Sequence, residues 1–165
     1  MLWSWALAVV ALVLAASGVL KLTDPQPSQP MLVELGLPAG SVAVRGWGLV
    51  ELLVSVAVLA GGPAAATVAL GVAYAAFAVM VAVLRYASPD TSCGCIGRWS
   101  APPTKRHIAI NVMGAIIATG CLVTNGSVGT TTTTTPSTIV FWVTAVLGAT
   151  AVLAALSDTF RRRQA

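Results

Sequence analysis

Residues 1–20 read MLWSWALAVVALVLAASGVL and contain no charged side chain. A helix rises about 1.5 Å per residue, so this stretch is long enough to cross a hydrocarbon core about 30 Å thick. A cleavable signal peptide is the alternative, because Ala15-Ala16-Ser17-Gly18 resembles a cleavage site, but the basic residues that precede the apolar run of such a peptide are missing. The stretch therefore predicts a membrane-spanning helix.

The composition of the whole chain indicates the same surroundings. Of the 165 residues, 57% are apolar and 8% are charged, whereas a soluble globular domain carries about 25% charged residues. This composition excludes an ordinary soluble domain and makes membrane lipid the expected environment. The formal net charge is +4, but the basic residues are scattered between apolar runs and form no stripe that could follow a phosphate backbone. We therefore expect no nucleic-acid partner.

Breaks in the apolar sequence divide the chain into five predicted spans. Four prolines and two acids prevent residues 21–45 from forming one helix, so this segment is predicted to be an interfacial loop, with residues 31–37 on the membrane surface. Gly61-Gly62-Pro63 is predicted to turn between two antiparallel spans whose many Ala and Gly residues allow close packing. The fold class is thus an all-α, polytopic transmembrane bundle with spans at 1–20, 42–60, 64–84, 108–124 and 137–157.

The nine Lys and Arg residues predict the orientation of these spans. With five crossings all nine fall on one face, in the loops at 21–45, which includes Lys21, and 85–107, and in the tail at 158–165. The other face holds the N-terminus, the Gly-Gly-Pro turn and the Thr-rich loop at 125–136, and it has no basic residue. By the positive-inside rule, we predict a multi-pass cell-membrane protein with its N-terminus outside and its basic tail in the cytoplasm.

The residues best suited to chemistry are Cys93 and Cys95, which are separated by Gly94 and followed by Ile96-Gly97. A disulfide can close across one residue, but its small ring is strained, which makes the bond easier to reduce and suits a redox carrier. Basic side chains in the same loop would favour the reactive thiolate: these are Arg98, Lys105, Arg106 and His107.

Two other interpretations of the cysteine pair stay open. The two thiols could be inert residues in a reduced cytoplasmic loop. A zinc site is the weaker alternative, since only Cys93, Cys95 and His107 are close in sequence and a tetrahedral site needs a fourth ligand; we therefore expect no metal. Cys121, more than 20 residues beyond the pair, is expected to be a small apolar filler.

Glu51 lies about two turns inside the second predicted span, with Trp47 and Ser55 at helical spacing on either side. An acid at that depth must face the bundle and find a partner or be protonated. Two roles are equally consistent with the sequence: a proton site or quinone contact, and a structural hydrogen bond to another span. Asn111, in the fourth span, is expected to hydrogen-bond between helices.

Two short motifs resemble known membrane-protein families. The segment ASGVLKLTDP at 16–25 is similar to the Ser-Gly-x-x-Lys-Leu-x-Asp-Pro signature of the DoxX-like superfamily. The signature positions are filled by Ser17, Gly18, Lys21, Asp24 and Pro25. The Cys-Gly-Cys-Ile-Gly loop is similar to the Cys-x-Cys-Phe-Gly loop of the methylamine utilisation branch, MauE, with Ile96 where Phe is common, and Glu51-Leu52-Leu53 also fits.

The resemblance implies a four-span core at 1–124 and a role in redox maturation. MauE-type proteins are polytopic membrane proteins implicated in maturing the disulfide-rich small subunit of methylamine dehydrogenase, next to a thioredoxin-like partner. By this resemblance, Cys93 and Cys95 would exchange redox equivalents with a thioredoxin-like protein, in a carrier without a separate catalytic domain. A non-catalytic membrane scaffold or assembly factor is the alternative, and a small-solute carrier is a weaker one, because the spans offer few polar groups and no inverted repeat.

The predicted orientation conflicts with that role in one respect. It places the cysteine pair on the cytoplasmic face, whereas an exported enzyme matures outside. A single thiol such as Cys121 cannot hold two electrons as an intramolecular disulfide, so a quinone or a partner protein would have to bridge the membrane. No cofactor is evident in the sequence itself.

Overall fold

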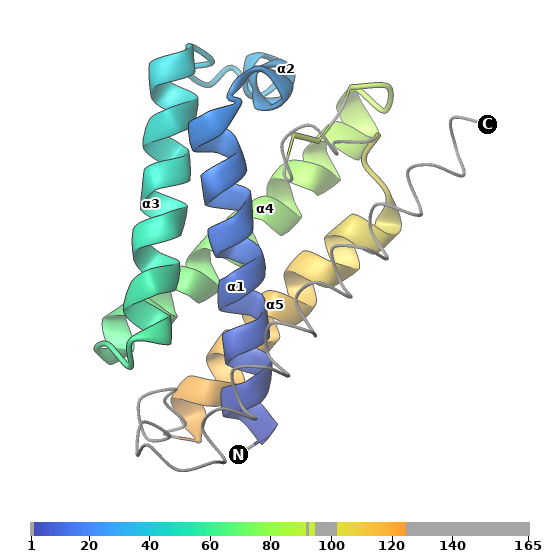
Figure 1. Ribbon diagram of the computed structural model, residues 1–165. Helices are drawn as coiled ribbons and strands as arrows, with labels where there is room; N and C mark the ends of the chain where they lie inside the picture. The colour runs from blue at the N-terminus through green and yellow to red at the C-terminus, as the bar shows by residue number, and fades with distance from the viewer. Residues whose placement is uncertain (1, 92, 95–101, 125–165) are drawn as a thin grey trace, which may run out of the picture.

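The described chain is a bundle of four long helices with one short helix across an end. In the computed structural model, α1 and α3 run side by side, and α4 and α5 form a second pair inclined to the first (Figure 1). The structure describes residues 2–91, 93–94 and 102–124, and it has no β-strand among them. The predicted loop at 125–136, the fifth span at 137–157 and the tail at 158–165 lie outside the described residues.

The four long helices are long and apolar enough to cross a membrane. They are α1 (Leu2–Thr23), α3 (Ser41–Leu59), α4 (Ala64–Ala87) and α5 (Lys105–Val123). The shortest have 19 residues, which at about 1.5 Å per residue gives a length of roughly 28 Å. Two short elements join α1 to α3: a 3-10 helix, η1 (Gln26–Ser28), and α2 (Gln29–Glu34). These helices confirm the prediction of an all-α, multi-pass membrane protein.

Glycine, proline and threonine set the helix ends. Between α3 and α4, Gly61 has a φ of 72°, and the Gly62 amide donates to the Ala57 carbonyl at 2.8 Å. Pro63 then precedes the first residue of α4. At the start of α5, the Thr104 hydroxyl accepts a hydrogen bond from the His107 amide at 3.3 Å, the usual arrangement of a threonine cap. The turn at 61–63 lies where the sequence predicts it.

The closest backbone approach is between α1 and α3. A Cβ added to Gly18 would lie 2.6 Å from the Gly48 carbonyl oxygen, and one added to Gly48 would lie 2.7 Å from the Gly18 carbonyl oxygen. The expected close packing of α3 on α4 is wrong, because these helices diverge from their shared turn (Figure 1) and α4 packs mainly on α5. The two glycines at the closest helix crossing, Gly18 and Gly48, lie on α1 and α3 instead.

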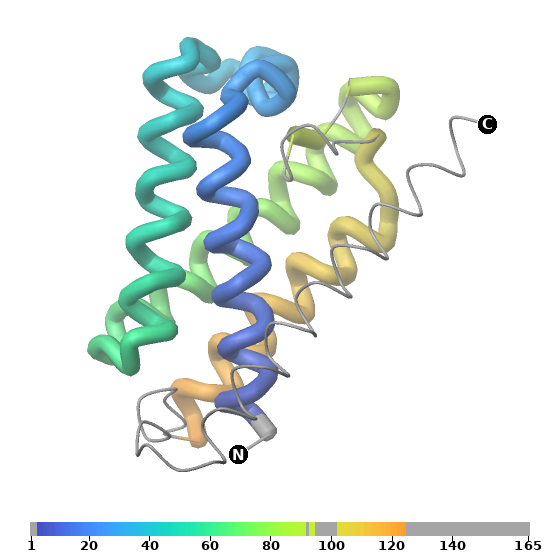
Figure 2. Tube along the Cα trace, viewed as in Figure 1, coloured from blue at the N-terminus to red at the C-terminus, as the bar shows by residue number. Residues whose placement is uncertain are grey.

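The largest apolar core lies between α1, α4 and α5. It is formed by Leu7, Ala8, Ala11, Leu14, Val58, Leu70, Tyr74, Phe77, Ala118 and Cys121. Figure 2 shows that the described chain ends close to the N-terminus, at the end of the bundle opposite α2. At that end, the Trp3 ring packs so closely against Gly120 that a Cβ there would lie 2.5 Å from a ring carbon.

Several charged residues that were assigned to loops lie in helices. The first span was predicted to end at residue 20, but α1 continues to Thr23, so Lys21 is helical and buried. It can stay inside because its ammonium group pairs with Glu51. Likewise, α4 includes Arg85, and α5 begins at Lys105 and thus includes His107, because Thr104 caps it upstream of the apolar run.

The short helix α2 also differs from its prediction. A surface segment was expected at 31–37, whereas α2 covers Gln29–Glu34 and buries Met31 and Leu32 against Val44 and Leu84. The reason is that α3 and α4 offer apolar side chains at this end, so one face of the helix packs on protein, while Val33 on the same helix is exposed.

Candidate functional site

A buried ion pair links α1 and α3. The Lys21 Nζ atom donates to Glu51 Oε2 at 2.9 Å and to Ser17 Oγ at 2.6 Å. Oε1 of Glu51 lies 2.8 Å from the same nitrogen, as a charge contact without a hydrogen bond of its own. The side chains of Lys21 and Glu51 are only 2% and 4% exposed, and the ammonium group also lies 5.4 Å from the centre of the Phe77 ring, within reach of a cation–π contact.

The ion pair depends on the close approach of the two helices. Gly18 and Gly48 face each other with their backbones in contact, and a Cβ on Gly48 would lie 2.9 Å from Cβ of Lys21. Larger residues at either glycine would push α1 away from α3 and separate the two charges. Ser17, Gly18 and Lys21, which were identified by resemblance alone, thus converge on Glu51.

Asp24 and Pro25, the remaining residues of the signature at 16–25, lead into the segment that contacts the cysteine loop. Asp24 donates its amide to the Leu20 carbonyl at 2.8 Å, and Pro25 then begins the turn into η1. The last residue of η1, Ser28, is 1% exposed and its hydroxyl donates to the Gly94 carbonyl at 2.7 Å. One continuous segment, 17–28, therefore contacts both Glu51 and the cysteine loop.

Gly94 fits its place because it has no side chain. Its φ is 60°, in the left-handed region that glycine adopts readily. A Cβ at this position would lie 2.7 Å from the Cα atom of Ser28. The backbone beside Cys93 is thus docked directly on η1.

Cys93 lies against the first turn of α5. Its Sγ atom is 4.0 Å from Nδ1 of His107, and the residue is 3% exposed. The backbone of His107 makes two hydrogen bonds to side chains. Its amide donates to Thr104 Oγ1 at 3.3 Å, and its carbonyl accepts from Asn111 Nδ2 at 2.8 Å. A protonated imidazole and a helix N-terminus can each stabilise a thiolate.

The structure does not place every predicted site residue. Cys95 and Arg98 lie outside the described residues, so the pair is seen through Cys93 alone. Within the described part of the chain, no three His, Cys, Asp or Glu side chains gather as metal ligands. Lys105 and Arg106 are exposed in the same turn as His107.

Two predictions about single polar residues have different outcomes. Asn111 was expected to bond to another helix, but the bond of its side chain runs to the carbonyl one turn back in α5, within the same helix. Cys121 is 0% exposed and belongs to the large apolar core, in the position expected of an apolar filler.

The geometry can now be set beside known proteins. Residues 1–124 match the family described as methylamine utilisation protein MauE. This chain belongs to the MauE family. The match includes all four long helices, the ion pair and the Cys93 loop of this MauE protein, and it ends where α5 ends. No curated protein and no solved structure gave a significant match.

Sequence reasoning about this MauE protein missed two contacts of the site. Ser28 follows a Pro-rich stretch and gives no sign that it binds the loop around residue 94, which is 66 positions away. Phe77 is one of many apolar residues of α4, and nothing in its surroundings in the sequence indicates a contact with Lys21. Both contacts are long-range, and neither belongs to a motif.

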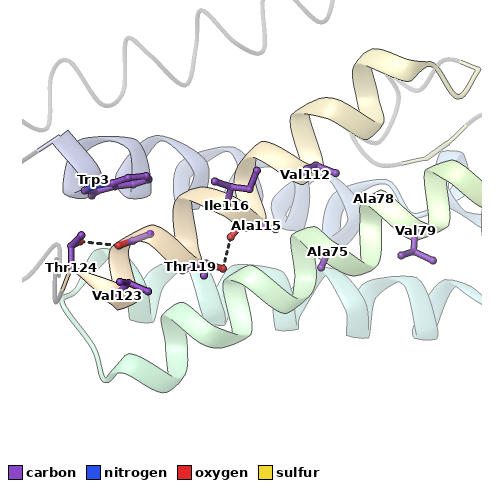
Figure 3. A pocket seen from close by; sticks show the side chains of 11 residues that line it. Trp3, Ala75, Ala78, Val79, Val112, Ala115, Ile116, Thr119, Val123 and Thr124 are labelled. Atoms are coloured by element: carbon purple, nitrogen blue, oxygen red, sulfur yellow. Dashed lines mark hydrogen bonds between the residues drawn. The ribbon is translucent and has the colours of Figure 1, made fainter.

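An apolar groove on the side of the bundle is separate from this site. It has a volume of about 680 Å³ and lies between α4 and α5, near Trp3 (Figure 3). Its two threonine hydroxyls, Thr119 and Thr124, donate to carbonyls of α5 itself at 2.9 and 2.8 Å. The described lining of this groove is therefore almost entirely apolar, and the protons of its two hydroxyl groups are engaged within α5.

Proposed function

We propose that this MauE protein exchanges thiols and disulfides with a thioredoxin-like protein through Cys93 and Cys95. The observation that supports this most directly is the position of Cys93, whose Sγ atom lies 4.0 Å from His107 Nδ1 at the start of α5. The thiolate is the form that attacks a disulfide, and an imidazole beside the thiol can take up its proton. A cysteine that serves only as an apolar filler does not require an imidazole beside its sulfur.

We infer that the exchanged equivalents serve the maturation of a disulfide-containing protein at the membrane. The family description names methylamine utilisation, and by extension the client is a methylamine dehydrogenase-type enzyme. The docking of the loop on η1 supports a specific role for it, because Gly94 and Ser28 fix the backbone beside Cys93.

Covalent trapping tests the proposal. Membranes from cells producing Cys93→Ser, Cys95→Ser, the double variant and Cys121→Ser are quenched with an alkylating reagent, and adducts are identified by mass spectrometry after non-reducing electrophoresis. A single remaining thiol can form a mixed disulfide but cannot resolve it. We expect at least one single variant to accumulate a reductant-sensitive adduct with a thioredoxin-like protein, and the double variant to form none.

Cys121→Ser is the matched control. Cys121 lies 14 residues beyond His107 on α5, which is about 21 Å along the helix, so its removal should leave trapping unchanged. If neither single variant traps a protein and all variants complement a deletion strain, the redox proposal is wrong. The scaffold or assembly-factor interpretation then replaces it.

A further inference from the structure

A polar recess lies at the end of the bundle where α1 ends and α3 begins. It has a volume of about 610 Å³, and Figure 1 shows α1, α2 and α3 meeting at this end. Its lining combines polar groups with charges of opposite sign, and it includes Asp24, Gln26, Gln29, Ser41 and Arg45. The recess thus differs from the groove beside Trp3, whose lining is almost entirely apolar.

Asp24 and Arg45 line this recess without pairing. Both residues are exposed, and among the residues that the structure describes neither side chain has a hydrogen-bonding or ionic partner. A guanidinium group binds a phosphate through two parallel hydrogen bonds, and a carboxylate accepts hydrogen bonds from an ammonium group. The two side chains together therefore suit a ligand that carries both a phosphate and an ammonium group.

The recess lies at the depth where a membrane supplies such a ligand. Because α1 and α3 are long and apolar enough to cross the hydrocarbon core, the end of α1 and the start of α3 reach the lipid headgroups. Trp47 follows Arg45 by two residues on α3 and is 45% exposed. Arginine and tryptophan side chains are both typical of the boundary between hydrocarbon and headgroups.

We propose that this recess binds a phosphate joined to a primary ammonium group, as in the headgroup of the membrane lipid phosphatidylethanolamine. Arg45 holds the phosphate, and Asp24 accepts hydrogen bonds from the ammonium group. The side-chain amides of Gln26 and Gln29 offer further donors and acceptors. The site uses none of the residues assigned to thiol exchange, so the lipid site and the thiol exchange can each fail without the other.

Three lipids with the same acyl chains separate the two halves of the headgroup. Phosphatidylethanolamine carries the phosphate and an ammonium group with N–H donors. Phosphatidylcholine keeps the phosphate, but its fully methylated nitrogen has no hydrogen to donate to Asp24. Phosphatidylglycerol has the phosphate and no cation. A site that needs both groups should therefore prefer the first lipid to the other two.

Native mass spectrometry of the detergent-purified full-length protein, titrated with the dioleoyl form of each lipid, measures this preference. The parent protein should bind its first phosphatidylethanolamine about fivefold more tightly than either other lipid. Asp24→Asn and Arg45→Gln should each abolish the preference. Equal binding of the three lipids by the parent, tighter binding of phosphatidylglycerol, or a preference kept by either variant overturns the proposal.

Asp90→Asn and Arg106→Gln are the matched controls. Both remove an exposed charge from the same end of the bundle, and neither residue lines the recess. Each control should bind phosphatidylethanolamine within about twofold of the parent. If the controls lose the preference as well, the binding reflects the overall charge of this end rather than the recess, and the proposal is wrong.

A free headgroup distinguishes a lipid from a soluble ligand of the same chemistry. Phosphoethanolamine, which has no acyl chains, should bind the parent protein at least about tenfold more weakly than the lipid, because the chains hold the headgroup at this depth. Equal or tighter binding of phosphoethanolamine would assign the recess to a soluble ligand and overturn the lipid assignment.

Discussion

Lys21 and Glu51 compensate each other's charge inside the bundle, so neither can be removed alone without cost. Removing one partner of a buried pair costs about 3–5 kcal/mol, whereas replacing both with apolar residues is often neutral or stabilising. We expect Glu51→Leu to lower the free energy of unfolding by about 3 kcal/mol, and Lys21→Met/Glu51→Leu to restore it. Unfolding of the detergent-solubilised protein, followed by circular dichroism, measures both.

The double variant also separates the two roles that the sequence left open for Glu51. Because Lys21 contacts the carboxylate at 2.8 Å, we expect a structural role, in which the restored double variant also traps its partner normally in the single-cysteine background that traps it in the parent protein. A stable double variant that no longer traps would assign the charge to the reaction. A double variant less stable than Glu51→Leu would contradict the compensation itself.

Among the helices, α1 and α3 depend most on the absence of side chains at their crossing. Gly18→Ala would place Cβ 2.6 Å from the Gly48 carbonyl oxygen, and backbone cannot yield as a flexible side chain can. We expect the variant to lose about 1–3 kcal/mol of unfolding free energy, measured in the same unfolding assay.

Gly46→Ala is the control for this substitution. Gly46 lies on α3, two residues before Gly48, and a Cβ there meets nothing within 4 Å. Because alanine favours a helix over glycine, this variant should be as stable as the parent or more stable by about 0.5–1 kcal/mol. If Gly18→Ala behaved like Gly46→Ala, the contact between the two backbones would not limit the packing.

Hydropathy predicts the four described spans well because membrane helices are defined by length and apolarity, which are local properties. It fails at the helix ends for an equally physical reason. A charged residue such as Lys21 indicates the start of a loop, because its partner Glu51 is 30 residues away in the sequence. His107 was assigned to a loop because Thr104 was not recognised as the cap of α5. Helix pairing was also missed, since Ala and Gly in α3 and α4 do not reveal which helix they face.

The candidate site was predictable in its residue types but not in its arrangement. Cys93 and His107 were singled out from their closeness in sequence, and the structure brings them to 4.0 Å. The Ser28–Gly94 contact could not be predicted, because a serine hydroxyl can bond to any nearby carbonyl and only the folded chain selects one.

For the molecule as a whole, the basic residues still indicate one orientation after Lys21 is set aside as a buried, paired charge. The other described basic residues lie where α3 begins, where α4 ends and where α5 begins, which is the end of the bundle that holds Cys93: they are Arg45, Arg85, Lys105 and Arg106. By the positive-inside rule, we expect this end in the cytoplasm and the α3–α4 turn outside.

Reporter fusions test this orientation. Alkaline phosphatase, which is active only when exported, should be active when fused after Gly62 and inactive when fused after Asp90. The opposite pattern would move Cys93 to the outer face, where an exported client could reach the loop without any relay across the membrane.

The distance along the chain between Lys21 and Glu51 also bears on how the protein is made. During synthesis α1 enters the lipid 30 residues before its counter-charge exists, and a lysine near a helix end can meanwhile extend its ammonium group to the headgroups. Once α3 has been inserted, the Glu51 carboxylate can pair with the Lys21 ammonium group inside the bundle. The buried ion pair therefore forms only after α3 has been inserted, so the final packing of α1 depends on a part of the chain that is made later.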